Sequence, residues 1–214
     1  MRNSLTLLFM AAACLVTCPA SGRAADETAK EFSGPQAGEK VTPFVVRAIV
    51  GDRAGDQIDL IKDADGKPLV LFFLHEVTRP SAGLARLVLN YAASRKADGL
   101  HAGLVLLSAD ATATEDWAKR AANALPAGVP IGIYKDGAEG PGAYGLNRKV
   151  AVTVLIAKQN QVTANFALVQ PSIAADAPRI AKAIAEALGD AALPTLEDLE
   201  RTSPPPRPKA KSSK

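Results

Sequence analysis

The sequence predicts an α/β fold, a three-layer sandwich whose central mixed sheet is flanked by helices and preceded by a β-hairpin. Residues 69–74 form an unbroken apolar run, LVLFFL, which is typical of a strand buried on both faces. Leu84, Leu87, Val88 and Tyr91 then recur at helical spacing. This succession of apolar strand and amphipathic helix is repeated further along the chain, as expected for an α/β domain.

The elements can be predicted in chain order from apolar periodicity and from turn residues. Thr78 is suited to cap the first long helix, and Asp176 is expected to cap the last, which Gly189 ends. The expected strands are 41–50 and 57–61 (the hairpin), 69–74, 100–108, 129–134, 150–156 and 162–168, and the expected helices follow 78, 112 and 176.

The first 25 residues have the pattern of a secretory signal peptide. A positive start is followed by an apolar stretch over 5–16 and by small residues up to Ala25. The apolar stretch is shorter than the roughly 20 residues of a membrane-spanning helix, so a membrane anchor is the weaker alternative. We therefore expect a secreted or periplasmic protein with four parts: a signal peptide (1–25), a flexible arm (26–37), a folded domain (38–190) and a disordered Pro/Lys-rich basic tail (191–214).

Both cysteines of the chain, Cys14 and Cys18, lie inside this leader. Cleavage would leave a mature protein that can form no disulfide and offers no thiolate. Lipidation of one of the two cysteines is the alternative, but it fits less well. Cys14 lacks the large aliphatic residue upstream, and Thr17 is unsuitable beside Cys18.

The net charge of +3 does not indicate a nucleic-acid-binding protein. Of the 25 basic residues, seven lie in the leader or after residue 200, which leaves 18 against 22 acidic ones. The folded part is therefore acidic, and no specific nucleic acid is expected as a partner. The basic tail allows at most a weak contact with an anionic surface.

A polar segment, His75 to Ser81, separates the strand 69–74 from the helix that follows. A Gly-Lys-Pro turn before an apolar strand, and a short loop that ends at a helix, resemble the thioredoxin-like superfamily. The resemblance is to its redoxin branch of peroxiredoxin-like and secreted thiol–disulfide oxidoreductase-like domains. It implies that Thr78-Arg79-Pro80-Ser81 stands where that family has Cys-x-x-Cys. It also implies that Val152, before Thr153, stands where the family has a cis-proline.

These departures change the expected chemistry. A helix N-terminus lowers the pKa of a thiol that starts near 8.5, but it contributes only about 1 kcal/mol, far too little to ionise Thr78 or Ser81 at neutral pH. Dithiol exchange by a cysteine-free mature chain is therefore excluded. A cis peptide before Val152 would cost roughly 3 kcal/mol, so we expect it to be trans.

Other site chemistries are less well supported. A glutathione transferase would need a second helical domain, for which the residues after Gly189 are too few. A Ser81–His75–Glu76 triad rests on adjacency alone, and a metal site through His75 and His101 lacks further ligands. Arg79, with the Thr78 and Ser81 hydroxyls, could hold an anion or a peptide carboxylate, although simple capping of the helix by Thr78 and Ser81 is the favoured interpretation.

The sequence thus predicts an exported, redox-inactive thioredoxin-like domain that acts as a binding or structural module for a protein or peptide partner. No catalytic residue, cofactor or metal is expected. The residues of the degenerate loop and its surroundings that are candidates for binding are His75, Thr78, Arg79, Ser81, Val152 and Thr153. The alternative is a thiol–disulfide oxidoreductase or peroxiredoxin-like enzyme of the cell envelope that works through a retained leader cysteine.

Overall fold

A computed structural model describes residues 31–203, and these residues are built around one mixed sheet. The sheet has seven strands in the order β2-β1-β5-β4-β3-β6-β7. Their bounds are β1 Val46–Val50, β2 Gln57–Ile58, β3 Leu69–Leu74, β4 His101–Leu106, β5 Ile131–Ile133, β6 Val152–Lys158 and β7 Gln161–Leu168. The predicted signal peptide, residues 26–30 and residues 204–214 lie outside the described part of the chain.

The three central strands run parallel, and both sides of the sheet are completed by antiparallel strands. β3 pairs with β4 and β4 with β5 in parallel, whereas β1 and β6 are antiparallel to their neighbours. All six residues of β3 are buried, as predicted from the apolar run. The mixed sheet and the N-terminal hairpin of β1 and β2 confirm the predicted fold class.

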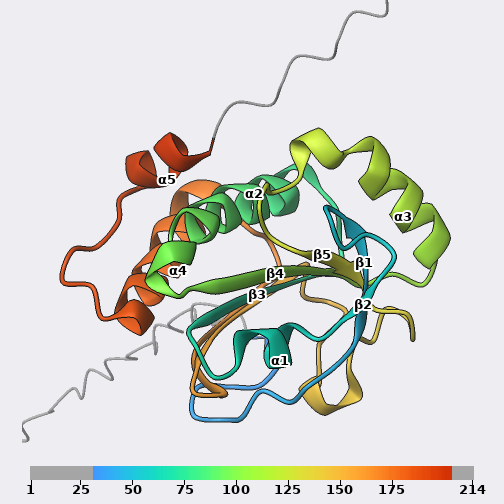
Figure 1. The fold of residues 1–214 in the computed structure, drawn as a ribbon, viewed down its shortest axis with the longest axis horizontal. Helices are drawn as coiled ribbons and strands as arrows, with labels where there is room; N and C mark the ends of the chain where they lie inside the picture. Colours follow the sequence, from blue (N-terminus) through green and yellow to red (C-terminus); the bar gives the residue numbers. More distant parts are fainter. Residues whose placement is uncertain (1–30, 204–214) are drawn as a thin grey trace, which may run out of the picture. The chain divides into compact units, whose positions relative to one another are not determined.

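Helices cover both faces of the sheet, which gives the three predicted layers (Figure 1). One face carries α2 (Arg79–Ser94), α3 (Ala111–Arg120), α4 (Ile173–Leu188) and α5 (Leu196–Thr202). The short helix α1 (Leu60–Ala64) lies on the other face. Successive side chains of β3 point to opposite faces, so Phe72 packs beneath the four helices and Phe73 packs on the α1 side.

An aromatic cluster fills the core on the α1 side. Phe44, Phe73 and Tyr144 have ring centroids 5.2 to 5.7 Å apart, in tilted and edge-to-face arrangements that aromatic pairs prefer. Tyr144 donates a hydrogen bond to the carbonyl of Thr42 over 2.9 Å. Burial raises the pKa of its phenol, so Tyr144 is a structural residue.

Two predicted boundaries are wrong. Residues 60–61, expected at the end of a strand, begin α1, because Asp59 caps that helix through the Ile61 and Lys62 N–H groups. The last long helix starts at Ile173, before the expected cap Asp176. Asp176 lies in the first turn instead, and its carboxylate accepts from the N–H of Ser172, the true N-cap.

The predicted disordered tail contains a helix, α5, and is corrected there. Thr195 and Asp198 form a capping box at its start, and Leu199 is fully buried where α5 packs on α2 and α4. The Pro/Lys-rich end of the segment predicts disorder. Leu196 and Leu199, however, are three residues apart and so share one helical face, which packs against the rest of the domain.

The described part of the predicted flexible arm, residues 31–37, is held by hydrogen bonds. Asn165 donates to the carbonyls of Ser33 and Pro35 over 2.8 Å, and Gly34 donates to Gly145. Ser33 is buried. Gly34 lies near the side chains of Thr153 and Leu155, so this segment packs on the sheet and belongs to the folded domain.

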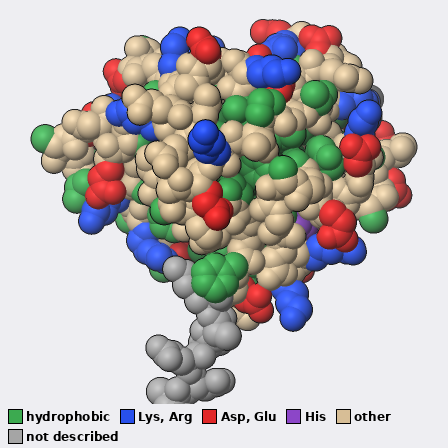
Figure 2. All heavy atoms as spheres, turned by 90° about the horizontal axis from the view of Figure 1, so that it is seen from below, with side chains coloured by type: hydrophobic (Ala, Val, Ile, Leu, Met, Phe, Trp, Pro, Cys, Tyr) green, Lys and Arg blue, Asp and Glu red, His purple; other side chains and the backbone are tan. Residues whose placement is uncertain are grey.

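The face opposite the four helices shows charges of both signs interspersed among apolar and polar side chains (Figure 2). A basic stripe that would track a nucleic-acid backbone is not visible on this face. Among residues 31–203, no helix combines the length and the apolar character that crossing a bilayer requires.

Candidate functional site

The loop that follows β3 lies against the residue that precedes β6. The N–H groups of His75 and Glu76 both point at the carbonyl of Ala151, over 3.0 and 3.4 Å. β3 and β6 are antiparallel neighbours in which Leu74 pairs with Val152. The fold therefore brings the loop 75–78 beside Val152, as the resemblance implied.

Thr78 and Ser81 form a complete capping box at the start of α2. The Ser81 N–H donates to Thr78 Oγ1 over 3.3 Å, and Ser81 Oγ accepts from the Thr78 N–H over 2.8 Å. Ser81 Oγ also donates to the carbonyl of Glu76 over 2.6 Å. Both hydroxyls thus serve the local backbone, and neither is next to a base that would activate it as a nucleophile.

The first turn of α2 offers little to an anion. Pro80 has no N–H, the Ser81 N–H is taken by Thr78, and the Ala82 N–H donates to the Thr78 carbonyl. Among the N–H groups of this turn, only that of Arg79 has no hydrogen-bond acceptor within residues 31–203. The guanidinium of Arg79 is exposed and makes no ion pair in the same part of the chain. Arg79 can therefore meet a carboxylate of a partner, but a multidentate anion site is not built here.

His75 is half-buried at the start of the loop, and both ring nitrogens are enclosed without a hydrogen bond among residues 31–203. Desolvation lowers its pKa, and the nearby backbone of Val150 and Ala138 only partly offsets this effect. Arg148 lowers the pKa further and Glu139 raises it. His75 is therefore an uncharged ring near neutral pH, packed between the loop and the segment before β6.

Val152 and Thr153 do not form one site with the loop hydroxyls. Val152 is buried and its peptide bond is trans, as expected, because the described residues contain no cis peptide. The Thr153 side chain, like that of its pair Phe73, faces the α1 side, and its hydroxyl bonds Ser33 Oγ over 2.6 Å. Ser33, which the sequence argument did not consider, accepts from the Asn147 N–H and makes this contact structural.

The two histidines lie at opposite ends of the sheet. His101 pairs with Leu69 at the start of β3, whereas His75 follows its last residue, so roughly 20 Å of strand separates them. Residues 31–203 contain no group of three or more metal-ligating side chains. A metal site shared by the two histidines is therefore excluded.

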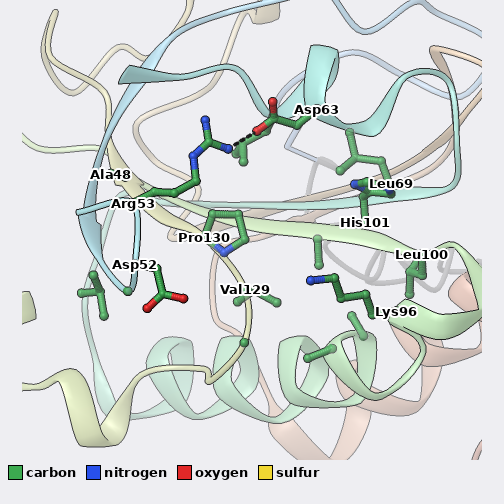
Figure 3. Close-up of a pocket in the computed structure, with 17 residues that line it drawn as sticks. Ala48, Asp52, Arg53, Asp63, Leu69, Lys96, Leu100, His101, Val129 and Pro130 are labelled. Carbon is green, nitrogen blue, oxygen red and sulfur yellow. Dashed lines mark hydrogen bonds and ion pairs between the residues drawn. The ribbon is translucent and has the colours of Figure 1, made fainter. Parts of the chain in front are cut away.

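A cavity of about 680 Å³ opens at the His101 end, away from the loop 75–78 (Figure 3). Leu69, Leu100 and Pro130 contribute apolar wall, while Arg53, Lys96 and His101 contribute polar groups. Sequence reasoning missed this cavity, because its walls come from segments that are far apart in the chain. One local signal was present: Pro130 immediately before a short strand cannot donate a strand hydrogen bond.

Comparison with known proteins yields structural likeness only. No protein-family model and no curated protein matches the chain. A structure provisionally assigned as the thiol:disulfide interchange protein DsbE of Chlorobium tepidum is 22% identical, covers 72% of this chain and 99% of its own, and superposes with a TM-score of 0.57.

Two further structures are similar to the same degree. A hypothetical protein of Sinorhizobium meliloti is 17% identical, covers 77% of this chain and 92% of its own, and has a TM-score of 0.54. An uncharacterized conserved protein of Geobacillus kaustophilus is 14% identical, covers 74% of this chain and 85% of its own, and also has a TM-score of 0.54. These likenesses confirm the thioredoxin-like fold. The replacement of active-site cysteines by Thr78 and Ser81 is not tested by them and stays a prediction.

Proposed function

We propose that this thioredoxin-like chain is an exported, redox-inactive module that binds a protein or peptide partner at the end of the sheet where the loop 75–78 lies. The observation that carries the proposal is the capping box of Thr78 and Ser81, which consumes both hydroxyls in the local backbone. Residues 31–203 contain no cysteine. By the resemblance, the loop stands at the position of a thiol site, and it has no group that can do thiol chemistry.

Exposed apolar side chains at this end support a binding role. Val77, Val169 and Ile173 are 42%, 46% and 36% exposed, and they are half of the six large apolar residues that residues 31–203 leave exposed. Val169 follows Leu168, which pairs with Val152. Ile173 packs on Gly83, where even a methyl group would lie 2.8 Å from the Ile173 side chain. The three therefore lie around the start of α2.

Charge adds a preference to this surface. Arg79, the first residue of α2, is exposed and makes no ion pair in the described chain, and charge-assisted contacts of Arg with carboxylates are among the stronger hydrogen bonds. A partner segment with apolar residues next to an acidic residue would match Val77 and Arg79. A single contact with Val77 or Arg79 would contribute little binding energy. We therefore propose recognition of a partner that also contacts Val169 or Ile173.

The enzymatic alternative requires a cysteine outside the described residues. A solved structure that resembles the chain is assigned to thiol:disulfide interchange, but here only Cys14 or Cys18 could supply a thiol. The mass of the exported protein, measured with thiol alkylation and an insulin-reduction assay, separates the two cases. A cysteine-free mass without insulin reduction supports the module, whereas a retained, labelled cysteine with turnover supports the enzyme.

Photo-crosslinking tests the binding surface directly. A photoreactive amino acid placed at Val77 should give one specific adduct in cells, and the charge reversal Arg79→Glu should reduce its yield several-fold. The matched control is Leu193, which is 53% exposed and lies between α4 and α5. Equal crosslinking from Leu193, or an adduct at Val77 that Arg79→Glu does not change, would contradict the proposed surface.

A further inference from the structure

The cavity at the His101 end is a gap in the sheet. β5 begins only at Ile131, which pairs with Leu104, so the first three residues of β4 have no paired residue in β5. On the far side of the gap, β1 pairs with β5 through Val50 and then turns away at Gly51. The cavity therefore lies beside the first residues of β4, past the point where both β1 and β5 end.

The backbone of Ala102 faces this gap with its hydrogen-bonding groups unused. Along β4, the N–H groups of His101 and Leu107 donate toward β3, and that of Leu104 donates to Pro130 on the β5 side. By this alternation the Ala102 N–H and C=O point toward the gap. Pro130, the residue that would donate to the Ala102 carbonyl, has no N–H, and within residues 31–203 no backbone group accepts from the Ala102 N–H.

The rest of the lining supplies apolar contact and a cation. Leu60, Leu69 and Leu100 are buried residues that border the cavity, and Val129 and Pro130 form the wall toward β5. Figure 3 shows the Lys96 side chain directed toward Val129 and Pro130, whereas Arg53 is turned to Asp63.

Only some of the charged side chains that line the cavity form ion pairs. The Arg53 guanidinium pairs with the Asp63 carboxylate over 2.7 Å. Lys96 forms no ion pair or hydrogen bond within the described chain, nor does the His101 ring form a hydrogen bond there. Asp52 lies at the exposed rim. The unpaired cation inside the opening is thus Lys96.

From these three features, we propose that the cavity binds a small carboxylate that carries a secondary amide and an apolar side chain, as in an N-acylated amino acid. The acyl carbonyl of the ligand would accept from the Ala102 N–H, as the carbonyl of a neighbouring strand does. Its carboxylate would meet Lys96, and its side chain would fill the space between the leucines. The site lies at the end of the sheet opposite the loop 75–78, so it does not depend on the proposed partner surface.

N-acetyl-L-leucine is the probe, and its uncharged methyl ester, which adds no N–H donor, is the matched control ligand. Titration of the isotopically labelled protein, followed by NMR, should shift the amides of Ala102, Lys96 and Val129 and leave the loop 75–78 unchanged. The acid should bind about fivefold more tightly than the methyl ester, the scale of one exposed charge contact. Hydrogen exchange of the Ala102 amide should slow on binding, while Leu104, already bonded to Pro130, should change little.

Variants separate the charge contact from non-specific binding. Lys96→Met, at an exposed position, should abolish the preference for the acid and keep the weaker binding of the methyl ester. Lys67→Met is the matched control, because Lys67 lies near His101 but does not line the cavity, and it should keep the preference. Shifts confined to the loop 75–78, an Ala102 amide that the probe does not protect, or an unchanged preference in Lys96→Met would overturn the proposal.

Discussion

Ser81 Oγ donates a hydrogen bond of 2.6 Å to the carbonyl of Glu76, five residues earlier, and accepts one of 2.8 Å from the N–H of Thr78. The side chain is fully buried. This single hydroxyl closes the loop between β3 and α2 on itself. The loop is therefore shaped by its own polar groups.

Replacing Ser81 with alanine should destabilise the protein by about 1–2 kcal/mol, because Glu76 and Thr78 would each lose a buried or partly buried hydrogen bond. Urea unfolding monitored by circular dichroism measures the change. Arg79→Ala, at an exposed position two residues before Ser81, is the control and should change the free energy of unfolding by less than about 0.5 kcal/mol. Equal stability of Ser81→Ala and the native chain would show that the cap is unimportant.

Installing two cysteines at the cap should create a dithiol site. Thr78 Oγ1 and Ser81 Oγ lie 3.0 Å apart, so sulfur atoms in these places need a modest shift to reach the disulfide length of about 2.05 Å. We expect Thr78→Cys/Ser81→Cys to form an intramolecular disulfide and to reduce insulin, whereas Ser81→Cys alone should not. If the double variant stays fully reduced under air, the loop does not have the geometry that the resemblance implies.

His75 should titrate below its ordinary value, because burial lowers its pKa from 6.5. The unfolded chain then binds the proton more readily than the folded protein. The folded state accordingly keeps full stability above about pH 6.5 and loses part of it as the pH falls below that value. NMR titration of the ring, assigned with His101→Leu, gives the pKa, and a value at or above 6.5 would contradict the enclosed position of His75.

Helix α5 should contribute to the stability of the domain. Leu199 is fully buried in the core that α2 and α4 share, so Leu199→Ala should cost about 2–4 kcal/mol, as usual for a buried leucine. Thermal and urea unfolding provide the measurement. Leu193→Ala, at a position 53% exposed, is the matched control with little expected effect. If both substitutions change the free energy of unfolding by similarly small amounts, α5 does not stabilise the domain and residues 196–202 belong to the tail.

Much of the fold could be predicted from the sequence because its signals are local. The run 69–74 predicts a buried central strand from its apolar composition alone, and Thr78 and Ser81 predict a cap from their spacing. The boundaries that were missed depend on weaker cues. Ile173 begins α4 because Ser172 can cap it, and only packing under α2 makes Leu199 a core residue.

By itself the sequence determined the strand–loop–helix at 69–94, the spacing of Thr78 and Ser81, and the absence of cysteine from residues 31–203. Only the tertiary structure decided that Thr153 bonds Ser33, that His75 and His101 lie apart, and that Ala102 faces a gap. Strand and cap signals arise between residues a few positions apart. Side-chain direction and cavity shape instead depend on strand register, which joins segments such as β1 and β4 that no local pattern connects.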